Sequence, residues 1–526
     1  MTEPRGDLEW GSIPGLVRSS VERFSEREAV VDGTVRMSFA DLGDAVDRAA
    51  AAVVAAGVEP GDRVAIWAPN CAEWMVAALG GVAAGGVLVP INTRFKGREA
   101  AYVLGRSRAR LLFTVRGFLD LDFPAMLGEA DDLPDLATTV LLKGTGGVGW
   151  DEFLGRASKG DAIQADHRAR ALGPGDRSDI IFTSGTTGRP KGVVCTHGQT
   201  LRVFEVWSRA VGLTEGDRYL VVNPFFHTFG YKAGFLAAIM RGATTIPHAV
   251  FDAASVMERI EAERVNVLPG PPTLYQSILN EPSRSGRDLS SLRLAVTGAA
   301  VVPVELIHRM RDELTFETIL TAYGLTESTG TATMCRPGDD PETIANTSGR
   351  AIPDTEVRVV DTGGAEVERG QPGEIVVRGY NVTEGYFEDP EATAEAIVDG
   401  WLHTGDIGVM DENGYVRITD RVKDMFIVGG FNAYPAEIEN ELLAHPAIAQ
   451  AAVVGAPDER LGEVGVAFVV LRTGKTMDPK GVLAWLKERI ANYKVPRRIE
   501  VVDALPVNAS GKVLKYELRE RANAPA

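Results

Sequence analysis

The sequence predicts an α/β protein with a large, layered N-terminal domain that includes a β subdomain, and a small α+β domain at the C-terminal end. Three observations predict this fold class. Strand-like and helix-like segments alternate up to about residue 350, short strands with turns follow over 356–421, and the spacing changes again beyond that point. We therefore expect one domain over residues 1–422 and a second over residues 423–526.

The N-terminal part predicts a hairpin, a helix and a βαβ alternation. Asp32-Gly33-Thr34 is a turn signal between two short strands, 29–31 and 35–37. Ser38 and Asp41 then match a capping box, which opens a helix that runs to Gly57. The next expected elements are a strand over 64–67, a helix over 72–84 and a strand over 87–91.

The later segments are shorter and differently spaced, which indicates a change of architecture. The β subdomain is expected to contain strands over 356–360, 374–378 and 415–418. The C-terminal domain is expected to contain helices over 435–444 and 480–491, and strands over 451–454, 466–471 and 499–502. About a hundred residues are enough for such a domain to fold.

Composition places the chain among ordinary globular proteins. It has 526 residues, with 55 Lys and Arg against 72 Asp and Glu, so its net charge is −17. This negative field disfavours nucleic acid as a main partner, because phosphate backbones bind basic faces. An anionic small molecule can still bind through a local cluster of donors.

The cysteines and the apolar segments bear on location. Cys71, Cys195 and Cys335 are too few and too scattered for a disulfide framework or a Cys-rich metal site, which favours a reducing cytosol. The N-terminus is polar and lacks the layout of a signal peptide. The least polar window, 74–91, contains four glycines and a proline and is too broken to span a bilayer. We expect a cytoplasmic protein.

A Gly- and Thr-rich run over 183–192, Thr-Ser-Gly-Thr-Thr-Gly-Arg-Pro-Lys-Gly, is the sharpest local feature. Glycines let backbone N–H groups turn toward an anion, and the hydroxyls and two cations add donors, so the run suits a polyphosphate. It is not a Walker A motif, because Pro190 stands where that motif requires a glycine. A strand over 193–195 follows, so we expect a phosphate-binding loop between two strands.

This run and six further motifs resemble the adenylate-forming superfamily, which includes acyl-CoA synthetases, luciferases and nonribosomal adenylation domains. The motifs occur in the family's order and extend over nearly the whole chain. They are NPFFH at 223–227, TGAA at 297–300, YGLTE at 323–327, WLHTGD at 401–406, DRVKD at 420–424 and Gly511-Lys512. The resemblance implies an enzyme in which a carboxylate attacks ATP to give an acyl-adenylate and pyrophosphate, and coenzyme A then gives the acyl-CoA and AMP.

The resemblance also implies a set of ATP-site residues. Thr326 would contact the α-phosphate, Glu327 would bind Mg²⁺, Asp406 would accept from the ribose hydroxyls, and Lys512 would bridge the substrate carboxylate and the α-phosphate. With His227, residues Thr326, Glu327 and Lys512 form the expected catalytic set. The full ATP-binding set is Thr183, Ser184, Gly185, Thr186, Thr187, Gly188, Lys191, Gly298, Ala299, Ala300, Tyr323, Gly324, Thr326, Asp406, Arg421 and Lys512.

The acyl and coenzyme A sites follow from the same resemblance. His227 would lie where the acyl pocket meets the pantetheine tunnel, and Lys232 is unusual beside an apolar pocket, where it would suit a substrate with an oxygen far from its carboxylate. The expected acyl neighbours are His227, Tyr231, Lys232, Phe235, Leu325, Thr329 and Gly330. Lys423 is the expected hinge of a mobile C-terminal domain, and Gly429, Gly430 and Phe431 would border the tunnel. Lys494, Arg497 and Arg498 are nearby basic candidates for coenzyme A phosphates.

The acid and the acceptor are less narrowly defined. The chain ends soon after Lys512, which favours coenzyme A over a fused carrier domain, although a separate carrier protein stays open as acceptor. Runs over 223–234, 267–277, 321–327 and 420–437 are similar to the actinobacterial ligases that activate the indane propionate left after sterol ring cleavage. A medium- or long-chain fatty acid and an aryl acid are the alternatives.

Two other function classes stay open as rivals. A kinase or P-loop ATPase would release ADP and phosphate, but the Walker A motif is lacking. A non-catalytic protein with the same fold is disfavoured because the expected functional residues are retained together. The sequence does not determine the oligomeric state, and a homodimer stays open.

Overall fold

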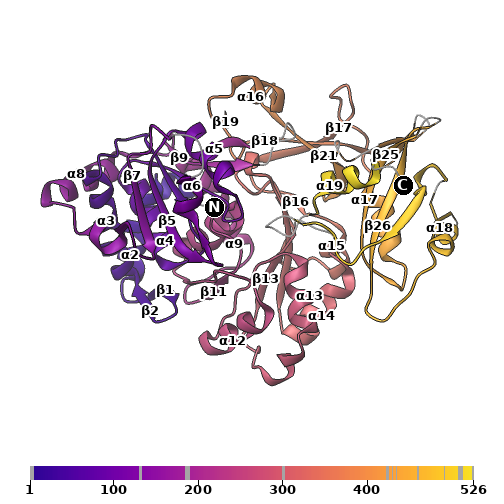
Figure 1. The fold of residues 1–526 in the computed structure, drawn as a ribbon, viewed down its shortest axis with the longest axis horizontal. Helices are drawn as coiled ribbons and strands as arrows, with labels where there is room; N and C mark the ends of the chain where they lie inside the picture. Colours follow the sequence, from indigo (N-terminus) through magenta and orange to yellow (C-terminus); the bar gives the residue numbers. More distant parts are fainter. Residues whose placement is uncertain are drawn as a thin grey trace. The chain divides into compact units, whose positions relative to one another are not determined.

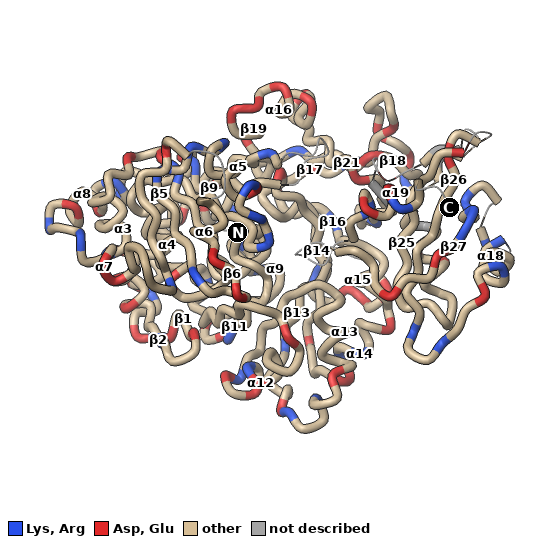
Figure 2. Tube along the Cα trace, viewed as in Figure 1, with Lys and Arg blue, Asp and Glu red and all other residues tan. Residues whose placement is uncertain are grey.

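The computed structural model describes residues 5–128, 133–183, 190–298, 302–421, 424, 426–428, 431–433, 435–458, 461–487, 489–490, 492–507 and 513–523. The chain divides into two compact units, and Figure 1 labels many of their helices and strands. The first unit comprises Met1–Glu356 and Val377–Leu402, and the second comprises Val357–Val376 and His403–Ala526. The domain boundary at residue 422 stays a prediction. Figure 2 shows basic and acidic residues interspersed along both units, so the negative net charge is spread over the chain.

The first sheet of unit 1 has the strand order β11-β12-β1-β2 in the described chain. Strands β1 (Glu28–Asp32) and β2 (Val35–Ser38) form an antiparallel hairpin, which confirms the prediction from the turn signal. Strand β12 (Thr244–Pro247) pairs in parallel with β1, and β11 (Arg218–Val221) pairs in parallel with β12. Segments far apart in the sequence thus share one sheet.

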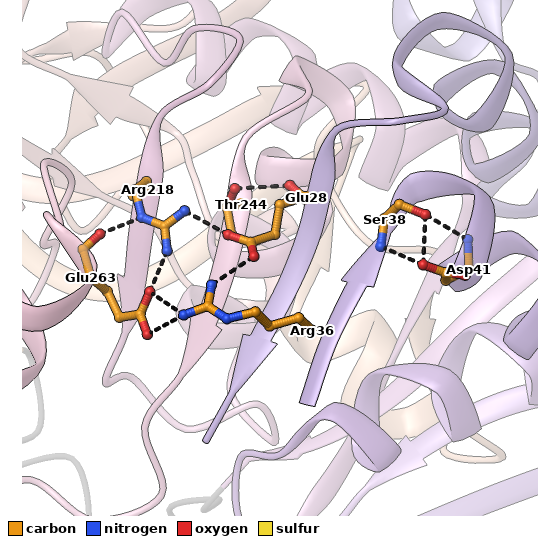
Figure 3. A network of polar contacts seen from close by, with 7 residues as sticks. All are labelled: Glu28, Arg36, Ser38, Asp41, Arg218, Thr244 and Glu263. Atoms are coloured by element: carbon orange, nitrogen blue, oxygen red, sulfur yellow. Dashed lines mark hydrogen bonds and ion pairs between the residues drawn. The ribbon is translucent and has the colours of Figure 1, made fainter. Parts of the chain in front are cut away.

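An ion-pair network ties these distant strands together (Figure 3). The Glu28 carboxylate accepts a hydrogen bond from Arg36 Nη1 at 2.7 Å and another from Arg218 Nη1 at 2.6 Å. The same two arginines contact the carboxylate of Glu263, at 2.8 Å and 2.5 Å. Burial acts to raise the pKa of Glu28, but the two arginines outweigh it and hold that pKa below its usual value.

The predicted capping box is confirmed, and it also appears in Figure 3. Asp41 N donates to Ser38 Oγ at 3.1 Å, and Ser38 N donates to the Asp41 carboxylate at 2.9 Å. Helix α3 (Phe39–Ala55) begins there and buries residues such as Ala45, Val46 and Ala49, although it ends two residues before Gly57. The pair satisfies two backbone groups that a helix N-terminus would leave without a partner.

The second sheet of unit 1 carries the predicted phosphate-binding loop. In the described residues its order is β19-β10-β9-β4-β3-β5-β7-β8, with β6 paired to β5. Its strands are β3 (Arg63–Trp67), β4 (Val87–Pro90), β5 (Ala109–Phe118), β6 (Leu121–Asp122), β7 (Thr138–Lys143), β8 (Val148–Gly149), β9 (Arg177–Thr183), β10 (Lys191–Thr196) and β19 (Gly385–Tyr386). Strands β9 and β10 are antiparallel, as expected for a loop between two strands.

Helices follow the parallel strands of this sheet. Helix α4 (Ala72–Ala83) is almost entirely buried and lies between β3 and β4 in the sequence, which explains why the window over 74–91 is apolar without spanning a membrane. The other helices of unit 1 include α1 (Gly6–Glu9), α2 (Ile13–Phe24), α5 (Gly97–Ser107), α6 (Phe123–Gly128), α7 (Trp150–Leu154), α8 (Lys159–Ala171), α9 (His197–Ala210), α11 (Ala237–Arg241), α12 (Ala253–Glu263), α13 (Pro272–Asn280), α14 (Val304–Leu314), α15 (Pro341–Asn346) and α16 (Pro390–Ala396). Among the described helices, none has both the length and the apolar sequence that crossing a bilayer requires.

The third sheet of unit 1 has the order β13-β14-β15-β16 in the described chain. Its strands are β13 (Leu294–Thr297), β14 (Thr318–Tyr323), β15 (Thr333–Met334) and β16 (Arg350–Ala351). Strands β13 and β14 are parallel, so their carboxyl ends lie at the same edge of the sheet. The TGAA and YGLTE motifs begin at these two ends.

The predicted short strands and the C-terminal α+β fold complete the chain. The β subdomain strands are β17 (Thr355–Val360), β18 (Pro372–Gly379), β20 (Ile397–Val398), β21 (Trp401–Met410) and β22 (Val416–Arg421), of which β17, β18 and β21 cross the unit boundary. The C-terminal elements are β23 (Phe426–Val428), β24 (Phe431–Ala433), α17 (Pro435–Leu443), β25 (Ile448–Asp458), β26 (Gly462–Leu471), α18 (Pro479–Lys487), β27 (Arg498–Val501) and α19 (Lys515–Asn523). All the predicted elements are present, but α18 ends at Lys487 and a short 3₁₀ turn over Asn492–Lys494 follows.

A buried histidine at the start of α9 makes the stability of the chain depend on pH. His197 is fully buried, and its Nδ1 accepts from Ile13 N at 3.2 Å, while Nε2 has no partner among the described residues. Burial lowers the pKa of His197 from 6.5 to about 4. The folded state therefore binds fewer protons than the unfolded state between these values, and stability is lost as pH falls through this window.

We expect His197→Asn to remove this pH dependence, because the amide oxygen of asparagine replaces the Nδ1 acceptor without a titrating ring. The loss of unfolding free energy between pH 7.5 and pH 5 should shrink by about 2 kcal/mol, which urea unfolding at the two pH values measures. His167→Asn, at an exposed position of α8, is the matched control. An unchanged pH dependence in His197→Asn would contradict the assignment.

Candidate functional site

The loop predicted to bind phosphate begins and ends on a paired residue. Thr183 closes β9, Lys191 opens β10, and the two are directly opposite in the antiparallel register. Residues 184–189, which include Ser184, Gly185, Thr186, Thr187 and Gly188, lie outside the described residues. Pro190 O accepts from the Tyr102 hydroxyl of α5 at 3.3 Å. The strand pair therefore holds both ends of the predicted loop at one place in the sheet.

The structure brings Glu327 to this place. A 3₁₀ turn over Thr326–Ser328 carries it directly after β14. Glu327 Oε1 accepts from Thr183 Oγ1 at 3.4 Å and from the Tyr386 hydroxyl at 3.0 Å. The sequence thus predicted two residues, Thr183 and Glu327, that the fold places in contact although 144 positions separate them.

Tyr386 is a neighbour of this carboxylate that no sequence motif singled out. It lies on β19, which pairs with β10 opposite Val193. Lys191 Nζ lies 5.1 Å from the centroid of the Tyr386 ring. The contact between Tyr386 and Glu327 depends on β19, which pairs with β10 although the two strands are far apart in the sequence. Local sequence patterns therefore do not predict it.

The adenine candidates follow the carboxyl ends of β13 and β14. Gly298 follows β13 and Tyr323 ends β14, and Thr297 is the register partner of Thr321. A Cβ on Gly298 would lie only 2.8 Å from Ala322 O, so close packing against the neighbouring strand requires glycine there. Ala299 and Ala300 lie outside the described residues.

The YGLTE turn packs against two predicted acyl neighbours. A Cβ on Gly324 would lie 2.4 Å from Gly330 O, which explains the glycine of this motif. Thr329 has a left-handed backbone with φ of 55°, and its hydroxyl donates to Asn381 O at 2.7 Å. Leu325 O accepts from Gly330 N at 2.8 Å, so Leu325, Thr329 and Gly330 form one compact turn.

The aromatic acyl candidates lie on a π-helix over Tyr231–Leu236, which follows the short helix α10 (Thr228–Gly230). Tyr231 and Phe235 are buried, with ring centroids 5.3 Å apart. The Phe235 ring also contacts Trp74 of α4 at 5.8 Å and Phe225 at 5.0 Å. π-helical turns inside helices are common at functional sites.

Lys232 is paired within the protein. Its side chain and that of Asp179 are both 0% exposed, and Lys232 Nζ lies 2.9 Å from Asp179 Oδ1. Burial alone would lower the pKa of this ammonium, but the Asp179 carboxylate outweighs burial and raises that pKa. The ammonium therefore stays charged, and Asp179 connects it to β9, the strand that precedes the predicted phosphate-binding loop.

His227 precedes α10 and is exposed to solvent. Its Nδ1 accepts from Phe229 N at 3.2 Å, so in the neutral ring Nε2 carries the proton. The surrounding chain partly removes the ring from water and lowers the pKa of the imidazole below its usual value. At neutral pH the ring therefore presents an N–H donor to the solvent.

The candidates of the second unit lie partly outside the described residues. Asp406 on β21 is buried, and it is the register partner of Arg421 on β22. Lys423, Gly429, Gly430 and Lys512 lie outside the described residues, and Phe431 begins β24. Arg497 contacts Asp458 at 3.2 Å and Arg498 contacts Glu500 at 3.0 Å, while Lys494 lies in the 3₁₀ turn after α18.

Comparison with known proteins identifies the family. The family model "AMP-binding enzyme" matches residues 17–387, and "AMP-binding enzyme C-terminal domain" matches residues 437–512. The chain belongs to the AMP-binding enzymes. The match to the C-terminal domain ends at Lys512, the lysine that the sequence resemblance implies is catalytic.

Relatives match this AMP-binding enzyme over nearly its whole length. It is 50% identical to the 3-[(3aS,4S,7aS)-7a-methyl-1,5-dioxo-octahydro-1H-inden-4-yl]propanoyl:CoA ligase of Rhodococcus jostii, over 97% of this chain and 98% of the relative. It is 51% identical to the ligase of the same name from Mycobacterium tuberculosis, with the same coverage. An anthranilate CoA ligase in complex with anthranoyl-AMP has a TM-score of 0.88 at 27% identity, over 98% of both chains.

These matches confirm two predictions from the sequence. The fold is that of the adenylate-forming enzymes, with a large α/β N-terminal part of several sheets and a small C-terminal domain. The enzyme class is an AMP-forming acid–CoA ligase, which uses ATP and coenzyme A.

Proposed function

We propose that this ligase activates a bicyclic indane propionate derived from a steroid. The carboxylate displaces pyrophosphate from ATP to form an acyl-adenylate, and the thiol of coenzyme A then displaces AMP. The full-length identity of 50% and 51% to two ligases named for this acid supports the proposal. Medium- or long-chain fatty acids and aryl acids are the alternative substrates, and a carrier protein is the alternative acceptor.

Glu327 fits a magnesium ligand. Its Oε1 accepts two hydroxyl hydrogen bonds, while no hydrogen bond to Oε2 occurs among the described residues, which leaves that oxygen for a cation. The described ranges contain no cluster of three or more His, Cys, Asp or Glu side chains that could hold a metal. One carboxylate together with phosphate oxygens and waters is the arrangement that Mg²⁺ adopts in nucleotide sites. The ion would neutralise phosphate charge.

The other groups would bind and orient the reactants. The loop after Thr183, with Lys191, would bind the phosphates, Thr326 would donate to the α-phosphate, and the Gly298 and Tyr323 segments would border adenine. Asp406 would accept from the ribose hydroxyls, and Arg421 would donate to the ribose or a phosphate. Lys512 would enter to reduce the repulsion between the carboxylate and the α-phosphate.

The acyl group would lie beside the π-helix. Tyr231 and Phe235 would supply an aromatic wall, and Thr329 and Gly330, of which Gly330 packs against Gly324 of the YGLTE segment, would border the acyl group. Because Lys232 is already paired with Asp179, we infer that it stabilises this wall from within the protein. The exposed Nε2–H of His227 would position the acyl carbonyl or gate the tunnel, without transferring a proton.

A panel of acids tests the substrate. The purified chain is supplied with ATP, Mg²⁺, coenzyme A and either indane propionates, fatty acids or aryl acids, and both AMP and the CoA thioester are measured. We expect the highest kcat/KM with an indane propionate that carries ring ketones. A higher value with a fatty or aryl acid would overturn the proposed substrate, and release of ADP and phosphate would overturn the proposed reaction.

The hinge makes a separate prediction. Replacing Lys423 by proline restricts the backbone on which the C-terminal domain would turn between the two half-reactions. We expect pyrophosphate exchange to stay near normal, while thioester formation from the adenylate falls about 10-fold or more, the effect of roughly 1.4 kcal/mol on that step. Lys423→Ala is the control. Equal losses in both half-reactions would argue against a hinge at this residue. A homodimer and a cytoplasmic location stay predictions.

A further inference from the structure

Two residues of one segment hold Glu327 at both its backbone and its side chain. Thr383 N donates to Glu327 O at 2.8 Å, and the Tyr386 hydroxyl donates to Glu327 Oε1 at 3.0 Å. The segment that contains Thr383 and Tyr386 is attached to the β9–β10 strand pair, because β19 pairs with β10 and the Thr383 hydroxyl donates to Val194 O. The position of the Glu327 carboxylate is therefore tied to the sheet that carries the loop.

Tyr386 itself has little freedom to move. Its backbone N donates to Thr393 Oγ1 of α16 at 2.9 Å, and a Cβ on the preceding Gly385 would lie 2.4 Å from Thr393 Cγ2. The close packing between β19 and α16 fixes the backbone that carries the ring. A preoriented donor loses little conformational entropy when it makes its hydrogen bond.

The Tyr386 ring also contacts a cation of the phosphate-binding segment. Lys191 Nζ lies 5.1 Å from the ring centroid, within the range of a cation–π contact. Tyr386 thus connects two groups of opposite charge, Glu327 and Lys191, that are both expected at the nucleotide.

We propose that Tyr386 is a positioning residue for the metal carboxylate. Its hydroxyl occupies Oε1 of Glu327 and would thereby leave Oε2 free to bind the cation that accompanies ATP. This inference rests on the proposed role of Glu327. Partners of a metal ligand typically change metal affinity or activity by about 10- to 100-fold when they are removed.

The test compares Tyr386→Phe with the unaltered full-length chain. The variant keeps the ring and its contact with Lys191 and removes only the hydroxyl. Calorimetry measures ATP affinity with and without Mg²⁺, and pyrophosphate exchange gives the Mg²⁺ concentration for half-maximal rate. We expect this concentration to rise about 10-fold or more, with kcat largely recovered at saturating Mg²⁺ and metal-free ATP affinity unchanged.

Tyr380→Phe is the matched control, because the Tyr380 hydroxyl is buried and has no hydrogen-bond partner among the described residues. An unchanged Mg²⁺ dependence in Tyr386→Phe, or an equal loss of metal-free ATP affinity, would overturn the inference. Glu327→Gln separates this failure from that of the proposed function. If Glu327→Gln alters the Mg²⁺ dependence and Tyr386→Phe does not, only the positioning role is wrong, and if neither variant alters it, the metal role of Glu327 is wrong as well.

Discussion

Replacing Lys512 by alanine is expected to lower the rate of acyl-adenylate formation by about 10²-fold or more, the scale for loss of one preorganised charge donor. The attacking carboxylate and the α-phosphate are both anions, and a cation between them reduces the repulsion that opposes their approach. Pyrophosphate exchange with the best acid measures this half-reaction. Thioester formation from presynthesised adenylate should be far less affected, because that step no longer joins two anions.

Lys475→Ala provides the control for Lys512→Ala. Lys475 is an exposed lysine in the turn after β26, so its removal changes the net charge of the same domain equally. We expect its pyrophosphate exchange to match that of the unaltered chain. Near-normal exchange in Lys512→Ala would refute the catalytic assignment.

Removing either partner of the buried Asp179–Lys232 pair is expected to destabilise the chain by about 3–5 kcal/mol. Both side chains are fully buried. The 2.9 Å contact does not align as a hydrogen bond, so the attraction between the two opposite charges stabilises the pair. Asp179→Asn leaves an ammonium without its counterion, and Lys232→Met leaves a carboxylate. Urea unfolding of each single variant measures the loss.

The double variant Asp179→Asn/Lys232→Met distinguishes lost pairing from lost packing. It removes both charges, and the amide oxygen introduced at position 179 can still accept from the Ser178 hydroxyl, which lies 2.6 Å from Asp179 Oδ2 in the unaltered chain. We expect the double variant to be more stable than either single variant, since no buried charge is left uncompensated. Additive losses would contradict the pairing. The exposed pair of Glu152 on α7 and Arg156 just after it is the control, and its removal should cost less than about 1 kcal/mol.

The sequence predicted the fold and much of the candidate site through local patterns. The Ser38–Asp41 capping box is contained in four consecutive residues, and the β9–β10 hairpin follows from an apolar strand on each side of a Gly-rich run. The ordered motifs likewise predicted an acid–CoA ligase. Hydrogen-bonding patterns of this kind need only neighbouring residues, so they can be recognised before the tertiary structure is known.

Sequence patterns did not predict which side chains contact one another across the sheets. Lys232 was singled out because an ammonium is unusual beside an apolar pocket, where it would suit a substrate with an oxygen far from its carboxylate. The structure pairs Lys232 with Asp179, which lies on a strand of the second sheet. A buried ammonium needs a counterion, but the strand order decides which carboxylate is within reach.

By itself, then, the sequence determined the class of fold, the order of the elements and the chemistry of the enzyme. Only the tertiary structure decided that Tyr386 contacts Glu327 across 59 positions and that Arg218 contacts Glu28 across 190. The physical reason is that secondary structure and turns depend on neighbouring residues, whereas a side-chain contact depends on how strands distant in the sequence are ordered and registered within a sheet.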